Sequence, residues 1–396
     1  MIVTVVCDVL GEENNGTTIA AMNLIRFLKK QGHTVRILCG DKNRMGEQDV
    51  FVVPNLDFGK WLNKYISKVG VSLAKPDEEI VRKALTGADI VHIMVPLKLG
   101  MYATKMAYDM GIPLTAGFHM QAENFTSYFK LNKIKFVNNT VYKYIWKNTY
   151  QYIDCIHYPT HFIRNTFEYC LKRSTKGRVI SNGVHSYVEH RDTPKPDELK
   201  DKYVILTTGR YAREKSQDTL IKAVNLSKHR DNIQLVLGGK GIKEKYYKKL
   251  AKKLPIQPIF KFFGRNEIID VLNYSDMYVH PAEIELEGIS CLEAIACGKL
   301  TIVSDSKLSA TKEFAVDEKC IFKCRNPKDL ARVIDYWIEH PEEAKQYEQK
   351  YMKSAKVFDQ EECMKEMEKM MLDVVSEKQA LKDNENSQST TDTTTK

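Results

Sequence analysis

Short apolar runs alternate along the chain with segments whose apolar residues recur at helical spacing. The first run is Val3 to Val9, and in the segment after it Leu24 and Leu28 share one helical face. Gly32 ends that segment before a second run, Val35 to Leu38. Such a succession of strand, helix and strand predicts a parallel sheet covered by helices.

The same succession continues and divides the chain into two series. In the first series the further predicted strands are residues 88–94, 112–118, 153–158 and 179–180. A polar, proline-bearing linker is predicted at residues 186–200. The second series contains predicted strands at residues 203–208, 233–238, 259–264 and 300–303. We therefore predict an α/β fold with two doubly wound domains, residues 1–185 and 201–345. Amphipathic helices are predicted over residues 346–376, and the polar residues 377–396 are expected to be disordered.

One stretch of the second series, Tyr278 to Ser304, combines an acidic loop with a helix start. Its first apolar run ends at Pro281, and Gly298 ends the following helix before another strand. The backbone N–H groups of Gly288, Ile289 and Ser290 are expected to point into the crevice at the carboxyl edge of the sheet, where an anion would bind. Glu285 and Glu293 lie beside them and can accept hydrogen bonds from hydroxyl groups. This combination suits a ligand that carries both phosphate and sugar.

The same residues have a purely structural interpretation. Ser290 and Glu293 have the spacing of a capping box, in which both side chains only satisfy the helix start. The glutamates of the loop would then be solvated surface charges.

Two cations follow the strand 203–208 directly. Arg210 and Lys215 flank a turn before the next helix, so both can reach the same edge of the sheet as Glu285. Ordinary surface charge is the alternative. Gly239 follows the strand 233–238 and would let a nucleotide approach the backbone. In the first series, His119 and Glu123 follow the strand 112–118 and are expected to face the crevice.

Composition limits the kinds of protein that this chain can be. Nine scattered cysteines predict a reducing compartment rather than a disulfide framework. The opening MIVTVVCDVL predicts a first strand rather than a signal peptide, and no apolar run reaches membrane-spanning length. The net charge of +9 allows an anionic partner, but no nucleic-acid-binding motif is present. We expect a cytosolic protein, or one that lies on a membrane.

Residues 125–152 differ from the rest of the chain. They mix lysines with many aromatic residues and contain no acidic residue. Val137, Val141 and Ile145 share the helical face that we expect to meet the core. The other aromatic residues, Tyr142 included, predict an interfacial surface on anionic lipid. Core packing of the aromatic residues is the alternative. A shorter segment of similar composition surrounds Trp61. The predicted membrane and acceptor residues are Trp61, Phe129, Lys133, Lys135, Phe136, Lys143, Trp146 and Lys147.

The motifs together resemble glycosyltransferase family 4, the large retaining family also called glycosyl transferases group 1. HPAEIELEGISCLEAIACG is similar to the E-x7-E motif of that family, and GRYAREK to its Gly-Arg-x-x-x-x-Lys segment. Ser181-Asn182-Gly183-Val184 resembles the Pro-Asn-Gly-Val turn that ends the first domain. The chain departs from the family at Leu286-Glu287, where Pro-Phe is common.

The resemblance implies a GT-B fold, with an acceptor-binding first domain, a nucleotide-sugar-binding second domain and last helices that cross back to the first. It implies catalytic roles for His119, Arg210, Lys215 and Glu285, with Arg210 and Lys215 on the diphosphate. The donor residues that it implies are Gly16, Arg210, Lys215, Gly239, Arg265, Glu285, Gly288, Ile289, Ser290 and Glu293. It implies no cofactor and no metal, in agreement with the absence of an Asp-x-Asp motif.

The expected function is the retaining transfer of glucose or galactose from a UDP-sugar to a membrane lipid such as diacylglycerol. The bacterial lipid α-glycosyltransferases are the relatives that this implies, with a peripheral position on the inner face of the cell membrane. Two alternatives stay open. One is a glycosyltransferase of capsule or other surface polysaccharide, and the other is a non-catalytic protein of this fold that binds nucleotide sugars.

Overall fold

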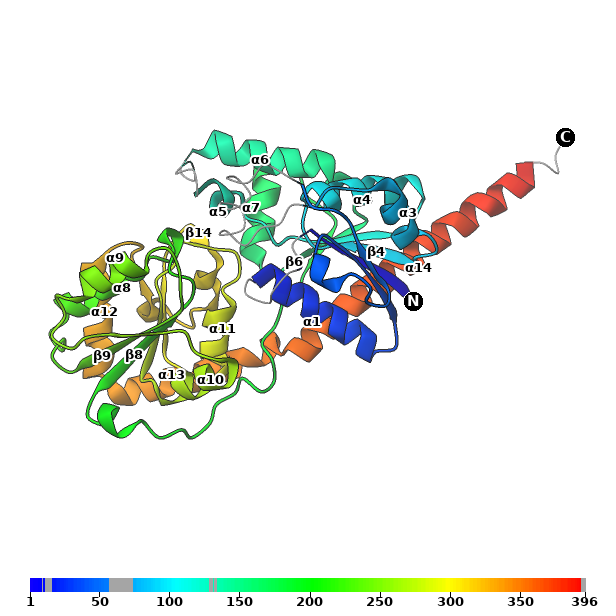
Figure 1. Ribbon diagram of the computed structural model, residues 1–396. Helices are drawn as coiled ribbons and strands as arrows, with labels where there is room; N and C mark the ends of the chain where they lie inside the picture. The colour runs from blue at the N-terminus through cyan, green and yellow to red at the C-terminus, as the bar shows by residue number, and fades with distance from the viewer. Residues whose placement is uncertain (9, 11–15, 57–73, 128–130, 132–133, 393–396) are drawn as a thin grey trace. The chain divides into compact units, whose positions relative to one another are not determined.

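The computed structural model describes residues 1–8, 10, 16–56, 74–127, 131 and 134–392 (Figure 1). The chain forms two compact units. The first contains Met1–Ala122, Ile134–Ile180 and the chain from Met364 onward, and the second contains Glu123–Lys133 and Ser181–Cys363. The first unit thus passes to the second after Ile180, five residues before the domain end predicted at residue 185, and Glu123–Lys133 also belong to the second unit.

The first unit is built on a seven-stranded parallel sheet of order β3-β2-β1-β4-β5-β6-β7. Its strands are β1 (Ile2–Cys7), β2 (Thr34–Cys39), β3 (Val50–Val52), β4 (Ile90–Ile93), β5 (Leu114–Gly117), β6 (Cys155–Tyr158) and β7 (Gly177–Val179). Its helices are α1 (Gly16–Lys30), α3 (Glu78–Leu85), α4 (Lys98–Asp109), α6 (Lys135–Asn148) and α7 (His161–Leu171). The strand order reverses between β1 and β4, which makes the sheet doubly wound.

The second unit contains a six-stranded parallel sheet of order β10-β9-β8-β11-β13-β15. Its strands are β8 (Tyr203–Thr208), β9 (Ile233–Gly238), β10 (Ile259–Lys261), β11 (Met277–His280), β13 (Thr301–Ser304) and β15 (Ile321–Phe322). A separate pair joins β12 (Ile284–Glu285) to β14 (Leu308–Ser309). The helices are α8 (Gln217–Leu226), α9 (Glu244–Ala251), α10 (Arg265–Tyr274), α11 (Ile289–Ala296), α12 (Pro327–Glu339) and α13 (Pro341–Ala355), and α5 (Ala122–Ser127) begins at the junction of the two units.

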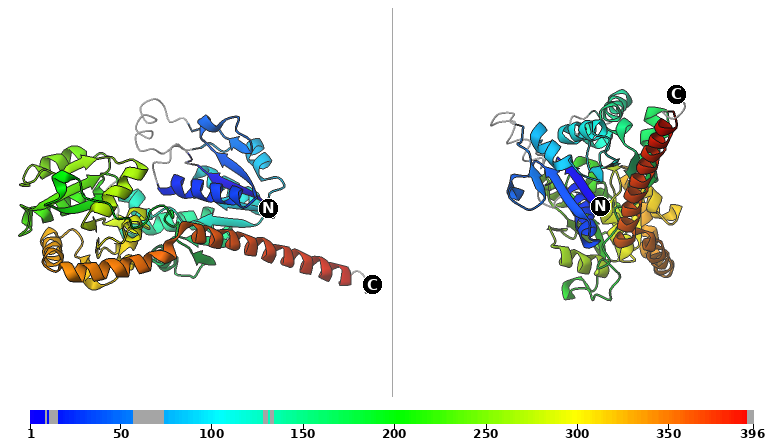
Figure 2. Two further views of the ribbon diagram at one scale, coloured as in Figure 1. Left: turned by 90° about the horizontal axis from the view of Figure 1, so that it is seen from below. Right: turned by 90° about the vertical axis from the view of Figure 1, so that its right-hand side faces the viewer.

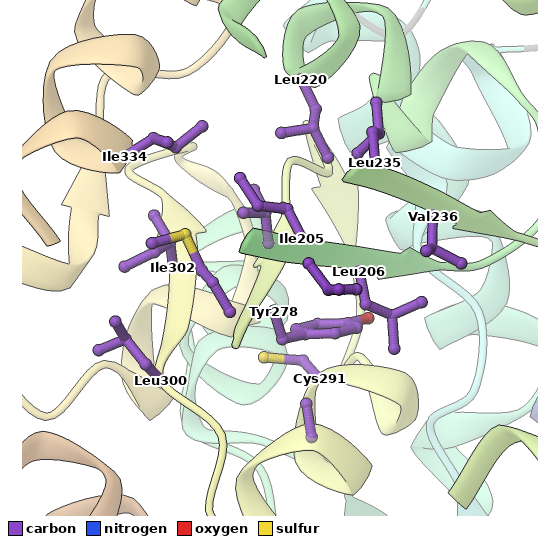
Figure 3. Packing of buried hydrophobic residues seen from close by; sticks show 14 of the residues in the cluster. Ile205, Leu206, Leu220, Leu235, Val236, Tyr278, Cys291, Leu300, Ile302 and Ile334 are labelled. Carbon is purple, nitrogen blue, oxygen red and sulfur yellow. The ribbon is translucent and has the colours of Figure 1, made fainter. Parts of the chain in front are cut away.

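The core of the second unit lies between this sheet and its helices. Figure 3 shows Ile205 of β8, Leu235 of β9 and Ile302 of β13 packed among side chains from α8, α11 and α12. Both faces of a parallel sheet are covered, so its strands are buried runs rather than alternating ones, as the burial of every residue of β9 shows. Burial of each such aliphatic side chain contributes about 1.5–3 kcal/mol, and this rigid core fixes the strand ends on which the site is built.

One long helix, α14 (Gln360–Asp392), continues from the second unit into the first (Figure 2). Within the first unit its residues form ion pairs with strand and loop residues: His33 with Glu368 at 2.6 Å and Arg178 with Asp373 at 2.6 Å. The methionines of this helix are buried at positions 364, 367, 370 and 371.

The last helices differ in two ways from the sequence prediction. Residues 346–355 belong to α13 in the second unit, so only the chain from Met364 onward packs in the first. The tail expected to be disordered from residue 377 is helical as far as Asp392. The chain from 360 to 392 lacks glycine and proline, so no residue in it interrupts the helix. No disulfide joins any of the nine cysteines, all of which lie within the described residues.

Candidate active site

Four neighbouring strands of the second unit end at one edge of its sheet. The strands β9, β8, β11 and β13 run parallel and end at Gly238, Thr208, His280 and Ser304. The residues predicted to bind the donor in this unit lie in the loops and helices that follow β8, β9, β10 and β11. This edge is where ligands bind in doubly wound sheets.

Gly239 lies against the loop that carries Arg210. Its φ is +156°, and a Cβ atom there would be 2.0 Å from the backbone oxygen of Gly209. The two loops are also joined by a hydrogen bond of 2.9 Å from the backbone N–H of Gly209 to the oxygen of Gly238. Only glycine allows this approach, which brings the predicted residues Gly239 and Arg210 together.

Glu285 lies between two basic side chains. Its carboxylate forms an ion pair with the ammonium group of Lys215, and the Nε2 atom of His280 lies 3.1 Å from the same oxygen. Burial alone would raise the pKa of Glu285, but Lys215 and His280 outweigh it and lower the pKa to about 2. Glu285 is therefore a fixed carboxylate at neutral pH, and the predicted pair of Lys215 and Glu285 is in direct contact.

Arg210 is held by a buried carboxylate. Its guanidinium donates to Glu214 at 2.9 Å, and the backbone oxygen of Arg210 accepts from the side chain of Gln217 at 3.1 Å. Glu214 in turn lies on the loop whose backbone oxygen accepts from the N–H of Glu283 at 2.7 Å. This last hydrogen bond ties the loop of Arg210 and Lys215 to the acidic loop of Glu285.

The residue that caps the start of α11 is Gly288 and not Ser290. Gly288 is the N-cap residue, with a φ of +88°, and a Cβ atom there would lie 2.6 Å from a methyl carbon of Thr311. The hydroxyl of Ser290 instead accepts from the hydroxyl of Tyr278 at 3.2 Å. The capping-box interpretation of Ser290 and Glu293 is therefore wrong, because the close approach of Thr311 requires glycine at the cap.

Beneath the site, a chain of polar side chains links β8 to the acidic loop. The Tyr278 hydroxyl lies 3.0 Å from the Thr208 hydroxyl and 3.3 Å from Nδ1 of His280, whose other ring nitrogen contacts Glu285. Tyr278 is buried, and burial raises the pKa of its phenol, so it stays a neutral hydrogen-bonding group. Sequence reasoning missed this role of His280. The only signal for it was the position of a histidine at a strand end, the same signal that was used for His119.

Glu293 lies in the first turns of α11, and the charge of Arg265 affects its pKa. Burial raises its pKa to about 7, and the positive charge of Arg265, the first residue of α10, acts against that increase. The structure thus brings the predicted residues Glu293 and Arg265 within electrostatic reach of each other. A carboxyl group with a pKa near 7 can be a hydrogen-bond donor or an acceptor at neutral pH.

Glu287, at the position where the chain departs from the family pattern, has a structural function. Its buried carboxylate accepts from the Ser181 hydroxyl at 2.6 Å, from the Asn182 backbone at 2.9 Å and from the Asn182 amide at 2.5 Å. It therefore anchors the turn Ser181-Asn182-Gly183-Val184 to the acidic loop. The charge that the departure introduces is fully hydrogen-bonded inside the second unit.

In the first unit, His119 follows β5 and lies beside two other histidines. Its ring is 5.5 Å from that of His157, and burial lowers the pKa of His119 well below its usual value, with a further contribution from His157 and His92. Gly117 makes room for the ring, since a Cβ atom there would be 2.3 Å from Nε2 of His119. His119 is thus a neutral imidazole. Glu123, the first residue of the chain that belongs to the second unit, is buried in α5.

The first helix of this unit begins at Gly16. Gly16 is exposed, and a Cβ atom there would meet no atom of the described residues within 4 Å. At the start of α4, the backbone N–H groups are bound by a side chain of the same unit. The carboxylate of Asp8 accepts hydrogen bonds from Leu99 N–H at 3.0 Å and from Gly100 N–H at 2.9 Å. Burial raises the pKa of Asp8 to about 6 despite these bonds.

The predicted membrane residues are exposed only in part. Phe136 on α6 is 79% exposed, and Lys135, Lys143 and Lys147 are also exposed. Trp146 is half-buried, with the Arg173 guanidinium 5.4 Å from its ring. Trp61, Phe129 and Lys133 lie outside the described residues.

The buried face of α6 differs from the one predicted. Asn138, Tyr142 and Ile145 are buried, whereas Val137 and Val141 are only partly buried. Tyr142, expected at the interface, is fully buried because its ring stacks on Phe118 and its hydroxyl accepts from the Ala122 N–H at 3.2 Å. The exposed face therefore presents Phe136, Lys143, Tyr144 and Lys147.

Two absences concern the described residues alone. Within the described ranges, no helix is both long and apolar enough to cross a bilayer. In the same part of the chain, no three His, Cys, Asp or Glu side chains are grouped so that they could hold a metal ion.

Comparison with known proteins gives family matches over both units. The model of Glycosyltransferase Family 4 matches residues 14–186, and that of Glycosyl transferases group 1 matches residues 189–354. Two proteins named alpha-monoglucosyldiacylglycerol synthase are similar to the chain. The one from Streptococcus pneumoniae is 24% identical over 72% of this chain and 66% of its own length, and the one from Acholeplasma laidlawii is 22% identical over 73% and 76%.

Among solved structures, Anabaena HepE in complex with UDP and glucose has a TM-score of 0.72 at 14% identity, covering 94% of this chain and all of that one. The predicted class of fold, two doubly wound domains of the GT-B type, is confirmed. The chain belongs to glycosyltransferase family 4, the glycosyl transferases group 1.

Proposed function

We propose that the protein transfers a hexose, glucose or galactose, from its UDP conjugate to a hydroxyl group of a membrane lipid such as diacylglycerol. The observation that carries the donor half of this proposal is the ion pair of Lys215 and Glu285 at the carboxyl edge of the second sheet. It puts a cation for a phosphate next to an ionised carboxylate for sugar hydroxyls. The names of the Streptococcus and Acholeplasma relatives support the lipid half.

In the proposed reaction, the bond between the anomeric carbon of the sugar and the diphosphate oxygen breaks, and a bond to the acceptor oxygen forms. Arg210, Lys215 and the N–H groups at the start of α11 stabilise the negative charge that develops on the departing UDP. The acceptor hydroxyl gives its proton to the departing phosphate and attacks from the same face, so the anomeric configuration is retained. No metal ion enters this scheme.

The remaining residues are proposed to orient the donor. Glu285 accepts hydrogen bonds from the sugar hydroxyls, and Glu293 accepts them from the ribose. His119, a neutral imidazole, is proposed to hydrogen-bond to the transferred sugar, a role that rests on the family resemblance. We propose that the exposed face of α6, with Phe136, Tyr144 and its lysines, binds the anionic surface of the membrane that holds the acceptor.

The test is release of UDP from each nucleotide sugar, with and without vesicles that contain diacylglycerol, and with a chelator in a parallel series. We expect release from UDP-glucose or UDP-galactose that requires diacylglycerol and is insensitive to the chelator. Release that is indifferent to lipid would favour a carbohydrate acceptor, as in surface polysaccharide synthesis. Binding of UDP without release from any donor would favour the non-catalytic alternative.

A further inference from the structure

A second segment rich in exposed lysine and aromatic residues lies in the second unit, over α9 and the chain on either side of β10. We call residues 240–265 the Lys–aromatic surface. This segment contains eight lysines and Arg265 but only one acid, Glu244. It therefore carries a charge of +8, while the net charge of the whole chain is +9. The rest of the chain is close to neutral.

The Lys–aromatic surface also exposes large apolar side chains. Ile242 is 87% exposed and Phe262 is 62% exposed, and Tyr246 is exposed as well. The lysines lie over the aromatic rings: Lys240 is 4.6 Å from the ring centre of Phe262, and Lys243 is 5.4 Å from that of Tyr246. Two further pairs of this kind are Lys248 with Phe260 and Lys261 with Phe263. Positive charge and apolar area are thus interleaved at the level of single residues.

The surface is held rigidly by the core beneath it. Tyr247, between Tyr246 and Lys248, is buried, and its hydroxyl donates to the backbone oxygen of Ala212 at 2.9 Å. Gly241 lies in close contact with the backbone of Tyr211. A Cβ atom on residue 241 would be 2.4 Å from the backbone oxygen of Tyr211. The exposed side chains therefore project from a fixed backbone, and folding leaves them in water.

A pocket of about 180 Å³ adjoins the surface. It is lined by Lys243, Tyr246 and Tyr247 from the α9 region and by Arg213, Asp218 and Arg325. Asp218 is paired with Lys222 at 2.9 Å, and Arg325 with Glu283 at 2.5 Å. Arg213 and Lys243 therefore leave the pocket with an excess of positive charge, suited to a phosphate group.

We propose that the Lys–aromatic surface is a second membrane-binding surface, which docks the second unit on a bilayer of anionic phospholipid. In this proposal the apolar and aromatic side chains insert to the depth of the lipid headgroups, and the lysines bind the lipid phosphates. The adjoining pocket receives one phospholipid phosphate. Exposed Ile242 favours a lipid interface over a nucleic acid, whose recognition uses cations and stacked aromatic rings but does not need a protruding isoleucine. The biological reason for such docking rests on the proposed lipid acceptor.

With α6 in the first unit, each unit then carries its own membrane-binding surface. Two weak contacts on one chain make the second binding event intramolecular, so the overall affinity exceeds that of either surface by a large factor. Loss of one surface is expected to weaken binding to vesicles by about tenfold or more, and loss of both to abolish it.

The experiment uses the full chain and co-sedimentation with vesicles of phosphatidylcholine, with or without about 30% phosphatidylglycerol as the anionic lipid. The variants are K245E/K249E, which reverses two exposed charges, and I242S/F262S, which removes the apolar side chains. The matched control, K345E/K353E, reverses two exposed lysines on α13. We expect both variants to bind the anionic vesicles about tenfold more weakly than the parent and the control to bind like the parent, with little binding of any protein to pure phosphatidylcholine.

Two further readouts make the outcome decisive. UDP release in the presence of diacylglycerol dispersed in detergent is expected to be unchanged in both variants. If the proposed function is wrong, the parent protein itself will not release UDP in this assay, so that failure differs from a failure of the membrane proposal. Parental sedimentation of both variants would overturn the proposal. So would tight binding of a labelled single-stranded oligonucleotide that K245E/K249E loses and I242S/F262S keeps. An R213A/K243A variant that still prefers phosphatidylglycerol to an equally charged sulfolipid would remove the pocket from the proposal.

Discussion

The Nε2 atom of His280 lies 3.1 Å from the carboxylate of Glu285, on the same oxygen that binds Lys215. Two basic groups from different strand ends thus hold one carboxylate in place. Nδ1 of the same ring is 3.3 Å from the Tyr278 hydroxyl, so the position of Glu285 depends on residues that are buried beneath the site. The predictions about catalysis follow from this arrangement.

Removal of the cation is expected to slow the reaction strongly. Lys215→Ala should lower kcat by about 10²–10³-fold, because it removes a fixed positive charge from the departing diphosphate. Lys222→Ala, which breaks an ion pair with Asp218 on the outer side of α8, is the control and should keep parental kcat. Release of UDP measures both. Undiminished turnover in a folded Lys215→Ala protein would contradict the proposed role.

His280 is expected to act as a positioning residue through Glu285. His280→Ala removes one of the two groups that lower the pKa of Glu285, so this pKa should rise from about 2 and the acid limb of the pH profile of kcat/KM should move to higher pH. His280→Gln keeps a hydrogen-bond donor and should restore part of the rate. An acid limb that stays in place while the rate falls would mean that His280 acts only on stability.

Donor binding is expected to depend on the ionisation of Glu293. Its pKa is raised to about 7, and only the carboxylate accepts hydrogen bonds from both ribose hydroxyls, so UDP-glucose should bind more tightly as pH rises from 6 to 8. The diphosphate of UDP-glucose does not titrate in this range. Calorimetric titration of the parent and of Glu293→Gln measures the effect, and the variant should bind weakly at every pH. Equal pH dependence in both proteins would contradict the assignment.

The same raised pKa affects stability. The folded protein keeps the proton of Glu293 at pH values where the unfolded chain, with a pKa near 4.5, has lost it. The contribution to stability is full below pH 4.5 and decreases as pH rises to about 7. In Glu293→Gln, the melting temperature should therefore fall less between pH 4.5 and 7 than in the parent.

Glu287 is expected to matter for stability and not for donor affinity. Glu287→Ala leaves the buried donors of Ser181 and Asn182 without their acceptor, which should cost about 1–3 kcal/mol and lower the melting temperature. Glu189→Ala, at an exposed carboxylate, is the control and should melt like the parent. The Kd of UDP for the folded Glu287 variant should equal that of the parent, and an affinity loss without a change in melting temperature would place Glu287 in the donor site instead.

The exposed face of α6 predicts which aromatic residues bind the membrane. Phe136→Ser with Tyr144→Ser should reduce binding to anionic vesicles several-fold and leave the melting temperature unchanged, because both side chains are exposed. Tyr142→Ser should instead lower the melting temperature, since Tyr142 is fully buried against Phe118. Vesicle binding as strong as that of the parent in the double variant would contradict the membrane role of α6.

Periodicity and motif spacing were sufficient for the fold and for the central part of the site. The apolar runs predicted the strands of both sheets except the short edge strands β3 and β15, because a parallel sheet buries both of its faces, which leaves continuous apolar runs in the sequence. The neighbouring ends of β8 and β11 then followed from parallel pairing, and with them the position of Lys215 and Glu285 at the same sheet edge, where the structure shows that they form an ion pair.

Only the tertiary structure decided roles that depend on packing between segments far apart in the chain. The cap of α11 is Gly288 because Thr311, more than twenty residues later, leaves no space for a side chain. The position of Tyr142 was decided by the aromatic ring of Phe118, and that of Glu287 by donors more than a hundred residues earlier. By itself, the sequence determined most of the strands and helices and which residue types reach the sheet edge, because those follow from local periodicity. It could not determine which neighbour each side chain meets, because that depends on how the elements pack in three dimensions.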